Sequence, residues 1–182
     1  MSQNVVNPYR YVAPAVTWYD YLLPQASAVE SGFEAAVTQR GEGTKTNASA
    51  MIGNKVTKVQ VYLKKFGSSF PNPTITCAVK AQADDANRVT IGTMNVSALR
   101  AIETFPTWTS ADLYTFESSN SYELADDDVI SIHFAGDDSN AIKTLSSNAT
   151  SLYDTNKSGR AAYVSGTWSV DAGEDLIALF AG

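Results

Sequence analysis

The sequence contains very few of the residues from which metal centres and covalent cross-links are built. Its 182 residues include one cysteine, Cys77, and one histidine, His133. A single cysteine has no partner within the chain, which excludes a disulfide scaffold. Zinc sites made from several cysteines and histidines are excluded by the same count.

Charge is also scarce, and more of it is negative than positive. Charged residues make up 18% of the chain, against roughly 25% in an average soluble domain. The formal net charge is -6, and the clearest basic cluster contains only Lys55, Lys58, Lys64 and Lys65. Because nucleic-acid binding needs a basic face that neutralises phosphates, the sequence predicts no nucleic-acid partner.

Long apolar runs are missing too. No stretch approaches the roughly 18 apolar residues that a membrane-spanning helix requires, so we expect no membrane insertion. The first residues lack the basic start and apolar run of a secretory signal. We therefore expect synthesis in the cytoplasm, with an extracellular or cell-surface location as the alternative if a signal was removed.

Residues 1–27 differ in composition from the rest of the chain. Half of the six prolines lie there, at Pro8, Pro14 and Pro24. The same segment carries five aromatic residues: Tyr9, Tyr11, Trp18, Tyr19 and Tyr21. Proline at this spacing disfavours helices and central strands, so an extended arm is predicted. Two alternatives stay open, since the rings would be buried either against the arm's own domain or against a neighbouring subunit.

Residues 28–182 have the pattern of a single β domain. Val59, Val61 and Leu63 alternate with polar residues, the period of two that a half-buried strand requires. The same alternation around Cys77 predicts that this residue is a small core side chain. Further strands are expected at 30–38, 48–52, 74–79, 88–94, 112–117, 129–134, 141–145, 160–164 and 176–180, and one helical turn at 97–103. Short strands separated by turn signals indicate an all-β antiparallel sandwich or a barrel.

The order of these segments resembles that of known β modules. The segments concerned are 52–67, 73–79, 91–96, Trp108, 113–116 and 122–132. Over about residues 48 to 182 the chain is similar to jelly-roll modules with a carbohydrate-binding-module-like fold, and to the jelly rolls of viral capsid and decoration proteins. The resemblance implies a single jelly roll but does not choose between these uses. An arm followed directly by a sandwich, without a signal, favours a virion protein.

Catalytic chemistry has little support in the sequence. A Ser-His-Asp site would have to use His133, which alternation places with Val129 and Ser131 on the face opposite Ile130 and Ile132. No Gly-x-Ser-x-Gly nucleophile motif is present. Residues 40–46 contain glycines and a lysine without the spacing of a phosphate-binding loop, and are predicted to be a mobile loop. We expect a protein that is not an enzyme.

Acidic pairs at the expected strand ends raise the question of a metal. Calcium needs six to eight oxygen ligands, and it is common among the modules that this chain resembles. Asp137 and Asp138, beside the turn residue Gly136, are the candidate calcium ligands. The alternative is that these aspartates only form turns and keep the protein soluble.

Aromatic residues in the expected loops offer a different chemistry. Five rings could stack on the apolar faces of sugars, with Trp168 the best candidate for an exposed one: Trp108, Tyr114, Tyr153, Tyr163 and Trp168. The alternative is that these rings belong to the core or to a subunit interface.

The leading hypothesis is a virion structural protein, a capsid, decoration or fibre component that forms a homo-oligomer and contacts other virion proteins. The alternative is a carbohydrate-binding or receptor-recognition module, calcium-dependent or not, with a surface glycan as its partner.

Overall fold

The computed structural model describes residues 18–19, 28–33, 35–67, 70, 73–101, 108–135, 142–147, 157–171, 173–176 and 178–182. Within these residues the chain forms β-strands and two 3-10 turns, η2 (Val96–Ala98) and η3 (Ser110–Asp112). The strands build two antiparallel sheets that pack against each other, which confirms the predicted all-β sandwich. No helix in the described part of the chain is long and apolar enough to cross a membrane.

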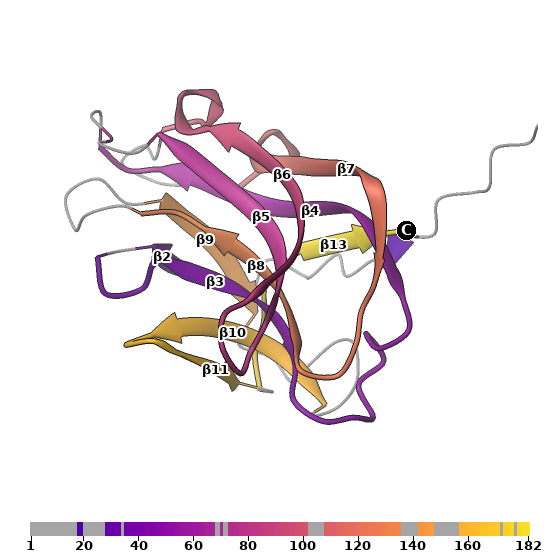
Figure 1. Ribbon diagram of the computed structural model, residues 1–182. Coiled ribbons are helices and arrows are strands. Elements are labelled where there is room, and N and C mark those ends of the chain that lie inside the picture. Colours follow the sequence, from indigo (N-terminus) through magenta and orange to yellow (C-terminus); the bar gives the residue numbers. More distant parts are fainter. Residues whose placement is uncertain are drawn as a thin grey trace, which may run out of the picture.

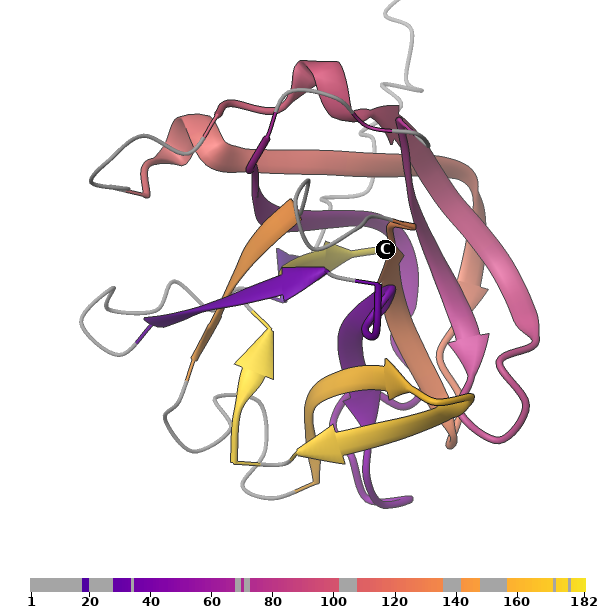
Figure 2. The ribbon, with the colours of Figure 1, turned by 90° about the vertical axis from the view of Figure 1, so that its left-hand side faces the viewer.

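The six-stranded sheet runs from the bottom to the top of Figure 1. In spatial order its strands are β11 (Thr167–Asp171), β10 (Ser158–Val164), β3 (Gln39–Thr44), β8 (Asp128–His133), β5 (Thr74–Ala81) and β6 (Asn87–Asn95). Figure 2 shows the tip of the gold β10–β11 hairpin beside the turn between β5 and β6. The sheet is therefore strongly curved, and its two ends approach each other.

The seven-stranded sheet is organised around the long strand β4 (Lys55–Lys65). β7 (Leu113–Glu123) pairs with one edge of β4, while β13 (Ala178–Ala181) and β9 (Ile142–Ser147) pair with it as well. The remaining strands are β1 (Trp18–Tyr19), β2 (Ala28–Phe33) and β12 (Asp175–Leu176). β2 and β12 pair with β9, and β1 pairs with β13.

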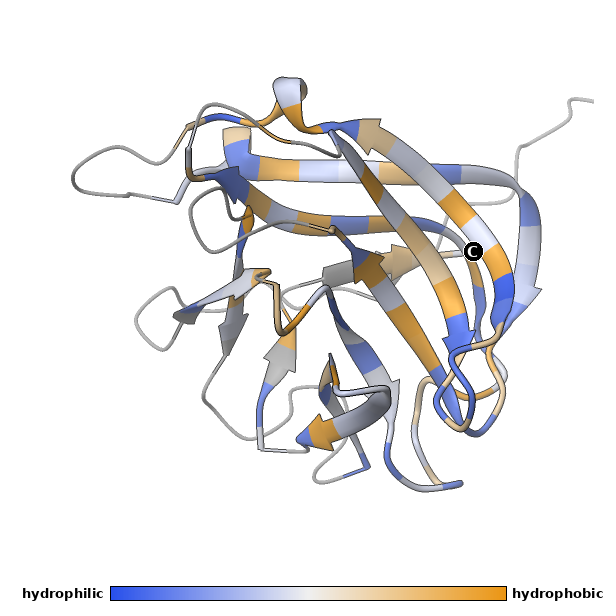
Figure 3. Cartoon of the chain, turned by 60° about the vertical axis from the view of Figure 1, so that its left-hand side comes forward, coloured by the Kyte–Doolittle hydropathy of each residue, from blue (hydrophilic) through white to orange (hydrophobic). Residues whose placement is uncertain are grey.

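The core lies between the sheets and follows the predicted alternation. Figure 3 shows hydrophobic and hydrophilic residues alternating along the strands. Val59, Val61 and Leu63 are fully buried, as is Cys77, and burial raises the pKa of the Cys77 thiol. Strand β8 has the predicted facing, because Ile130 and Ile132 belong to this core whereas Ser131 lies on the outer face.

Two predictions near the start of the domain are wrong. Residues 40–46, expected to be a mobile loop, mostly belong to β3, which pairs with β8 on one side and β10 on the other. The glycines permit close packing there, since a Cβ at Gly41 would lie 2.2 Å from the carbonyl oxygen of Ile130. Residues 48–52, expected to be a strand, form turns, whereas the strand expected at 30–38 is present as β2 with the bounds Ala28–Phe33.

Part of the predicted arm belongs to a sheet. Trp18 pairs with Ala181 and Tyr19 with Phe180, which makes β1 an edge strand beside β13. Tyr9, Tyr11 and Tyr21 lie outside the described residues.

Candidate functional site

A row of polar and aromatic residues crosses the outer face of the six-stranded sheet. Each residue lies directly opposite the next on the neighbouring strand, so the row runs perpendicular to the strands. We call it the polar row; its members are Thr93, Thr76, His133, Gln39, Tyr163 and Trp168. Every one of the six strands contributes one side chain.

The adjacent row on the same face is made of small residues. Ala78, Ser131, Gly41 and Ala161 are paired neighbours there, and Val170 of β11 follows them. This shallow floor accommodates the β10–β11 hairpin. Trp168 packs with Val129 and Ala161, and its ring lies 5.3 Å from that of Tyr163. The curvature of the sheet thus follows from the absence of large side chains in this row.

Asp85 is the polar centre of this surface. It lies in the turn between β5 and β6 with φ of 58°, in the left-handed region. Its carboxylate accepts hydrogen bonds from Gln39 Nε2 at 2.9 Å, Lys80 Nζ at 3.0 Å and Trp168 Nε1 at 3.1 Å. The Gln39 amide oxygen accepts one from Ser131 Oγ at 3.0 Å. One carboxylate thus connects β3 and β5 to the far edge strand β11.

His133 lies beside these groups, and its hydrogen-bonding capacity is not used by them. The side chain is half-buried, and no hydrogen bond from another described residue reaches its ring nitrogens. Burial and the nearby Lys80 ammonium lower the pKa of His133 below its ordinary 6.5, while the Asp85 carboxylate partly opposes them. The imidazole is therefore mainly neutral near pH 7.

Ser131, His133 and Asp85 share this face, yet they are not arranged as a nucleophilic triad. The Ser131 hydroxyl donates to Gln39, and Asp85 is occupied by three other donors. Within the described residues no hydrogen bond joins His133 to either of them. A serine nucleophile requires that contact with its base, so these three side chains do not form a nucleophilic triad.

The two tryptophans proposed as stacking platforms are buried, which corrects that expectation. Trp168 is 7% exposed because it fills the floor of small residues. Trp108 is 8% exposed; its indole nitrogen donates to Glu30 Oε1 at 2.9 Å, and Tyr62 and Lys64 contact its ring. Neither ring offers an open face to a ligand. Buried indoles need a partner for the N–H group, and both have one.

Three further candidate site residues belong to segments outside the described part of the chain. Tyr153, Asp137 and Asp138 lie outside the described residues. Among the residues that are described, no group of three or more histidine, cysteine, aspartate or glutamate side chains could hold a metal ion.

A second polar cluster lies between the two sheets. Arg160 forms an ion pair with Glu174 and donates to Ser31 Oγ at 3.2 Å, and Ser31 in turn contacts Ser146 at 3.1 Å. Glu42 accepts a hydrogen bond from the backbone nitrogen of Leu176 at 2.7 Å. These contacts join β10 and β3 of one sheet to β2, β9 and β12 of the other. Their role is to fix the packing of the sheets.

The polar row was only partly visible in the sequence. Alternation placed Ser131 and His133 on one face, and Thr76 on the polar face of its own strand. Gln39 was missed, because its position depends on the register between distant strands. Asp85 was visible only as one of several acidic pairs at strand ends, since its role depends on a turn conformation and on Trp168. Comparison of the chain with protein-family models, with curated proteins and with solved structures finds no match.

Proposed function

We propose that this protein is a virion structural protein, a capsid, decoration or fibre component that works through contacts between identical subunits and with other virion proteins. The observation that carries the proposal is β1. Residues of the predicted arm add as a strand to β13 at the edge of the seven-stranded sheet.

A short strand that pairs with β13 of its own chain can pair in the same way with β13 of another copy. Edge addition uses backbone hydrogen bonds, so any segment of suitable length can occupy the edge. Only Trp18 and Tyr19 take part, and each backbone hydrogen bond contributes about 0.5–1.5 kcal/mol net. The same two residues can therefore pair with β13 of a neighbouring copy at little cost, as in domain-swapped assemblies.

The composition of the chain supports the same function. A surface rich in hydroxyls and amides and low in charge, with few reactive side chains, suits a protein that functions by binding other protein subunits. The aromatic residues of the arm provide the apolar area that subunit interfaces use.

Deletion of the arm tests the proposal. We expect the full chain to form a discrete oligomer by mass photometry, and a variant lacking residues 1–25 to be a monomer with an unchanged β circular-dichroism spectrum. A variant lacking residues 1–17 keeps β1 and is the matched control; it should retain assembly if β1 is the exchanged segment.

Two results would overturn the assembly proposal. One is a full chain that remains monomeric at all concentrations. The other is loss of β structure on deletion of residues 1–25, because the arm would then belong to the fold. The virion assignment has a test of its own, since genes for a portal, a terminase or a major capsid protein should neighbour the gene for this chain.

A further inference from the structure

The floor of small residues on the six-stranded sheet is buried, although it lies on the side of the sheet away from the core. Ala78 is 2% exposed, and Ala161 and the adjacent Val129 are 0% exposed. A sheet that packs one face on the core normally leaves the other face to solvent, so something must cover this one. Trp168 of β11 packs against Val129 and Ala161, and Val170 of β11 packs on the same cluster. β11 is therefore a cover of the outer face.

This cover is attached to the rest of the sheet on one side only. Within the described residues β11 is an edge strand, and it pairs with β10 alone. β10, β3 and β8 are each paired on both sides. The turn before β11 contains Ser165 and Gly166, with φ of 53° and 86°, so it is formed by these two residues without help from other elements. β11 can thus leave the face while the central strands stay paired.

One hydrogen bond ties β11 to the far side of the sheet. Trp168 Nε1 donates to Asp85 Oδ1 at 3.1 Å, and Figure 2 shows the hairpin tip beside the turn that carries Asp85. The other carboxylate oxygen, Oδ2, accepts from Gln39 at 2.9 Å and from Lys80 at 3.0 Å. The acceptor is therefore held by β3 and β5, independently of β11. The contact has a fixed half, Asp85, and a half that can move, Trp168.

We propose that β11 is a strap that closes the outer face of the six-stranded sheet and opens without unfolding of the rest of the protein. In the closed state, Trp168 fills the floor and bonds to Asp85. In the open state, both contacts are lost together and Val129 meets solvent, while Asp85 keeps its bonds to Gln39 and Lys80. Because opening exposes a large indole ring, the closed state predominates. The strap belongs to the sheet opposite β1 and is separate from the assembly proposal.

Native-state hydrogen exchange of the full chain tests the strap in the wild type. We expect the β11 amides that bond to β10 to be at least about 10-fold less protected than the amides of the central strand β8, with little dependence on low urea concentrations, because opening exposes little surface. The indole N–H of Trp168 should have the same protection factor as these β11 amides, since one opening frees both. It is one of three indole signals in the chain, and its absence from the spectrum of Trp168→Phe assigns it.

Two substitutions test the bond that holds the strap. Asp85→Gly removes the acceptor and suits the turn, because Asp85 has φ of 58° and glycine adopts this region without strain. Trp168→Phe removes the donor and keeps a ring over the floor. Each should speed β11 exchange by about 10-fold, the equivalent of one hydrogen bond to a charged group. The double variant should fall short of the product of the two effects, because both changes remove the same bond.

The matched control is Asp84→Asn in the same turn. Asp84 is exposed, and its Oδ1, which accepts from the backbone nitrogen of Ala86 at 3.0 Å, is kept in asparagine. This variant removes the same charge as Asp85→Gly and should leave β11 exchange unchanged.

Three results would overturn the proposal. One is a Trp168 indole N–H protected as strongly as the β8 amides, because β11 would then open only with the whole fold. Another is unchanged β11 exchange in Asp85→Gly. The third is acceleration of β8 exchange to the same degree as β11 exchange in the variants, or of β11 exchange in Asp84→Asn. A variant that fails to fold leaves the wild-type measurement, which decides by itself.

Discussion

Replacement of Asp112 by asparagine should strongly destabilise the protein. This carboxylate is fully buried at the end of η3. Its Oδ2 accepts from the backbone nitrogen of Thr109 at 2.8 Å, its Oδ1 accepts from Arg100 Nη1 at 3.0 Å, and Lys64 Nζ lies 3.5 Å away. Asparagine has the same shape but replaces one acceptor oxygen with a donor, so at least one of these donors would face another donor.

The size of the effect follows from burial. Lys64 is 3% exposed and lies over the ring of Trp108, so its ammonium cannot turn to water without disturbing that contact. Removing one partner of a buried ion pair costs about 3–5 kcal/mol. Arg100 is 45% exposed, so water can replace its contact with Asp112. Loss of that contact therefore adds little to the free-energy cost. Against a total stability of about 5–15 kcal/mol, the change is large.

Urea unfolding at neutral pH measures this cost. We expect Asp112→Asn to lower the midpoint by roughly 2 M with an unchanged slope. The matched control is Glu117→Gln, which breaks the 2.9 Å ion pair between Lys58 and Glu117, where the side chains are 29% and 59% exposed. An exposed pair contributes at most about 1 kcal/mol. Equal, small losses in the two variants would refute the reasoning, because burial would then not determine the cost.

Two further predictions concern the six-stranded sheet. Gly41→Ala should destabilise the protein by at least about 2 kcal/mol, since the added Cβ meets the backbone of Ile130. Gly43→Ala is the control on the same face of β3, where the nearest atom is the movable Val170 side chain; comparable losses from the two would contradict this reason. Burial raises the pKa of the Asp128 carboxyl above its ordinary 3.8, so the native state favours the protonated form. The stability that the protonated Asp128 carboxyl contributes is fully present below pH 3.8. It is lost as the pH rises through the pKa that Asp128 has in the native state. The wild type should therefore gain stability relative to Asp128→Asn as the pH falls from neutral toward 4, and urea titrations at several pH values that show a constant difference would contradict this.

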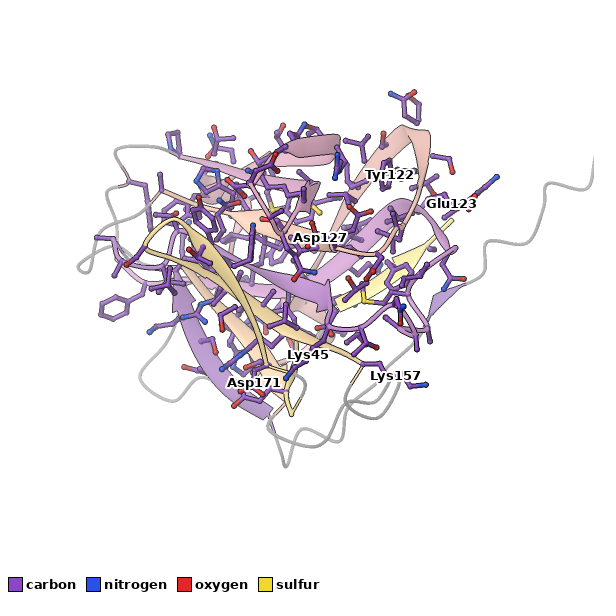
Figure 4. All side chains as sticks on the ribbon, turned by 60° about the horizontal axis from the view of Figure 1, so that its bottom comes forward. Lys45, Tyr122, Glu123, Asp127, Lys157 and Asp171 are labelled. Atoms are coloured by element: carbon purple, nitrogen blue, oxygen red, sulfur yellow. The ribbon has the colours of Figure 1, made fainter. Side chains whose placement is uncertain are left out.

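The contacts around Asp128 explain why its native environment is closed to water. Its Oδ2 accepts a hydrogen bond from the backbone nitrogen of Ala125 at 2.8 Å, and Tyr122 lies beside it on β7. Asp127, the preceding residue, has φ of 69°, and its nitrogen donates to Thr44 Oγ1 at 3.1 Å. Tyr122 and Asp127 are labelled in Figure 4. The turn before β8 is thus held to both β7 and β3.

Alternation made much of the sandwich predictable from the sequence. In β4, β5 and β8, buried apolar residues alternate with residues on the other face, and this pattern predicted both their existence and their facing. The core residues are Val59, Val61 and Leu63 in β4, Ile75, Cys77 and Val79 in β5, and Ile130 and Ile132 in β8. The pattern fails at β3, where three of the six residues, Gly41, Glu42 and Gly43, have low strand propensity. The two glycines allow neighbouring strands to approach closely. Glu42 accepts a hydrogen bond from the backbone nitrogen of Leu176 in β12. Both roles depend on tertiary contacts that no local pattern contains.

The candidate site was less predictable for a related reason. Trp168 has the sequence context of an exposed turn residue, between Gly166 and Val170, yet the curvature of the sheet brings it over a floor of small residues. Asp85 looks like one of many turn aspartates. Asp85 differs from the others because Trp168, on the opposite edge strand, donates a hydrogen bond to it. Neither residue could be assigned this role from the sequence without knowing that the two meet.

The arm strand and the polar row lie on different sheets, so changes to one can be separated from changes to the other. The arm strand β1 belongs to the seven-stranded sheet, whereas the polar row covers the outer face of the six-stranded sheet. A subunit that exchanged β1 with a neighbour would bury an edge of the first sheet and leave the second face accessible. The arm deletion should therefore abolish assembly and leave the six-stranded sheet intact, so Gly41→Ala should lower the urea midpoint of the truncated chain as much as that of the full chain. A much smaller effect in the truncated chain would show that the two sheets do not act independently.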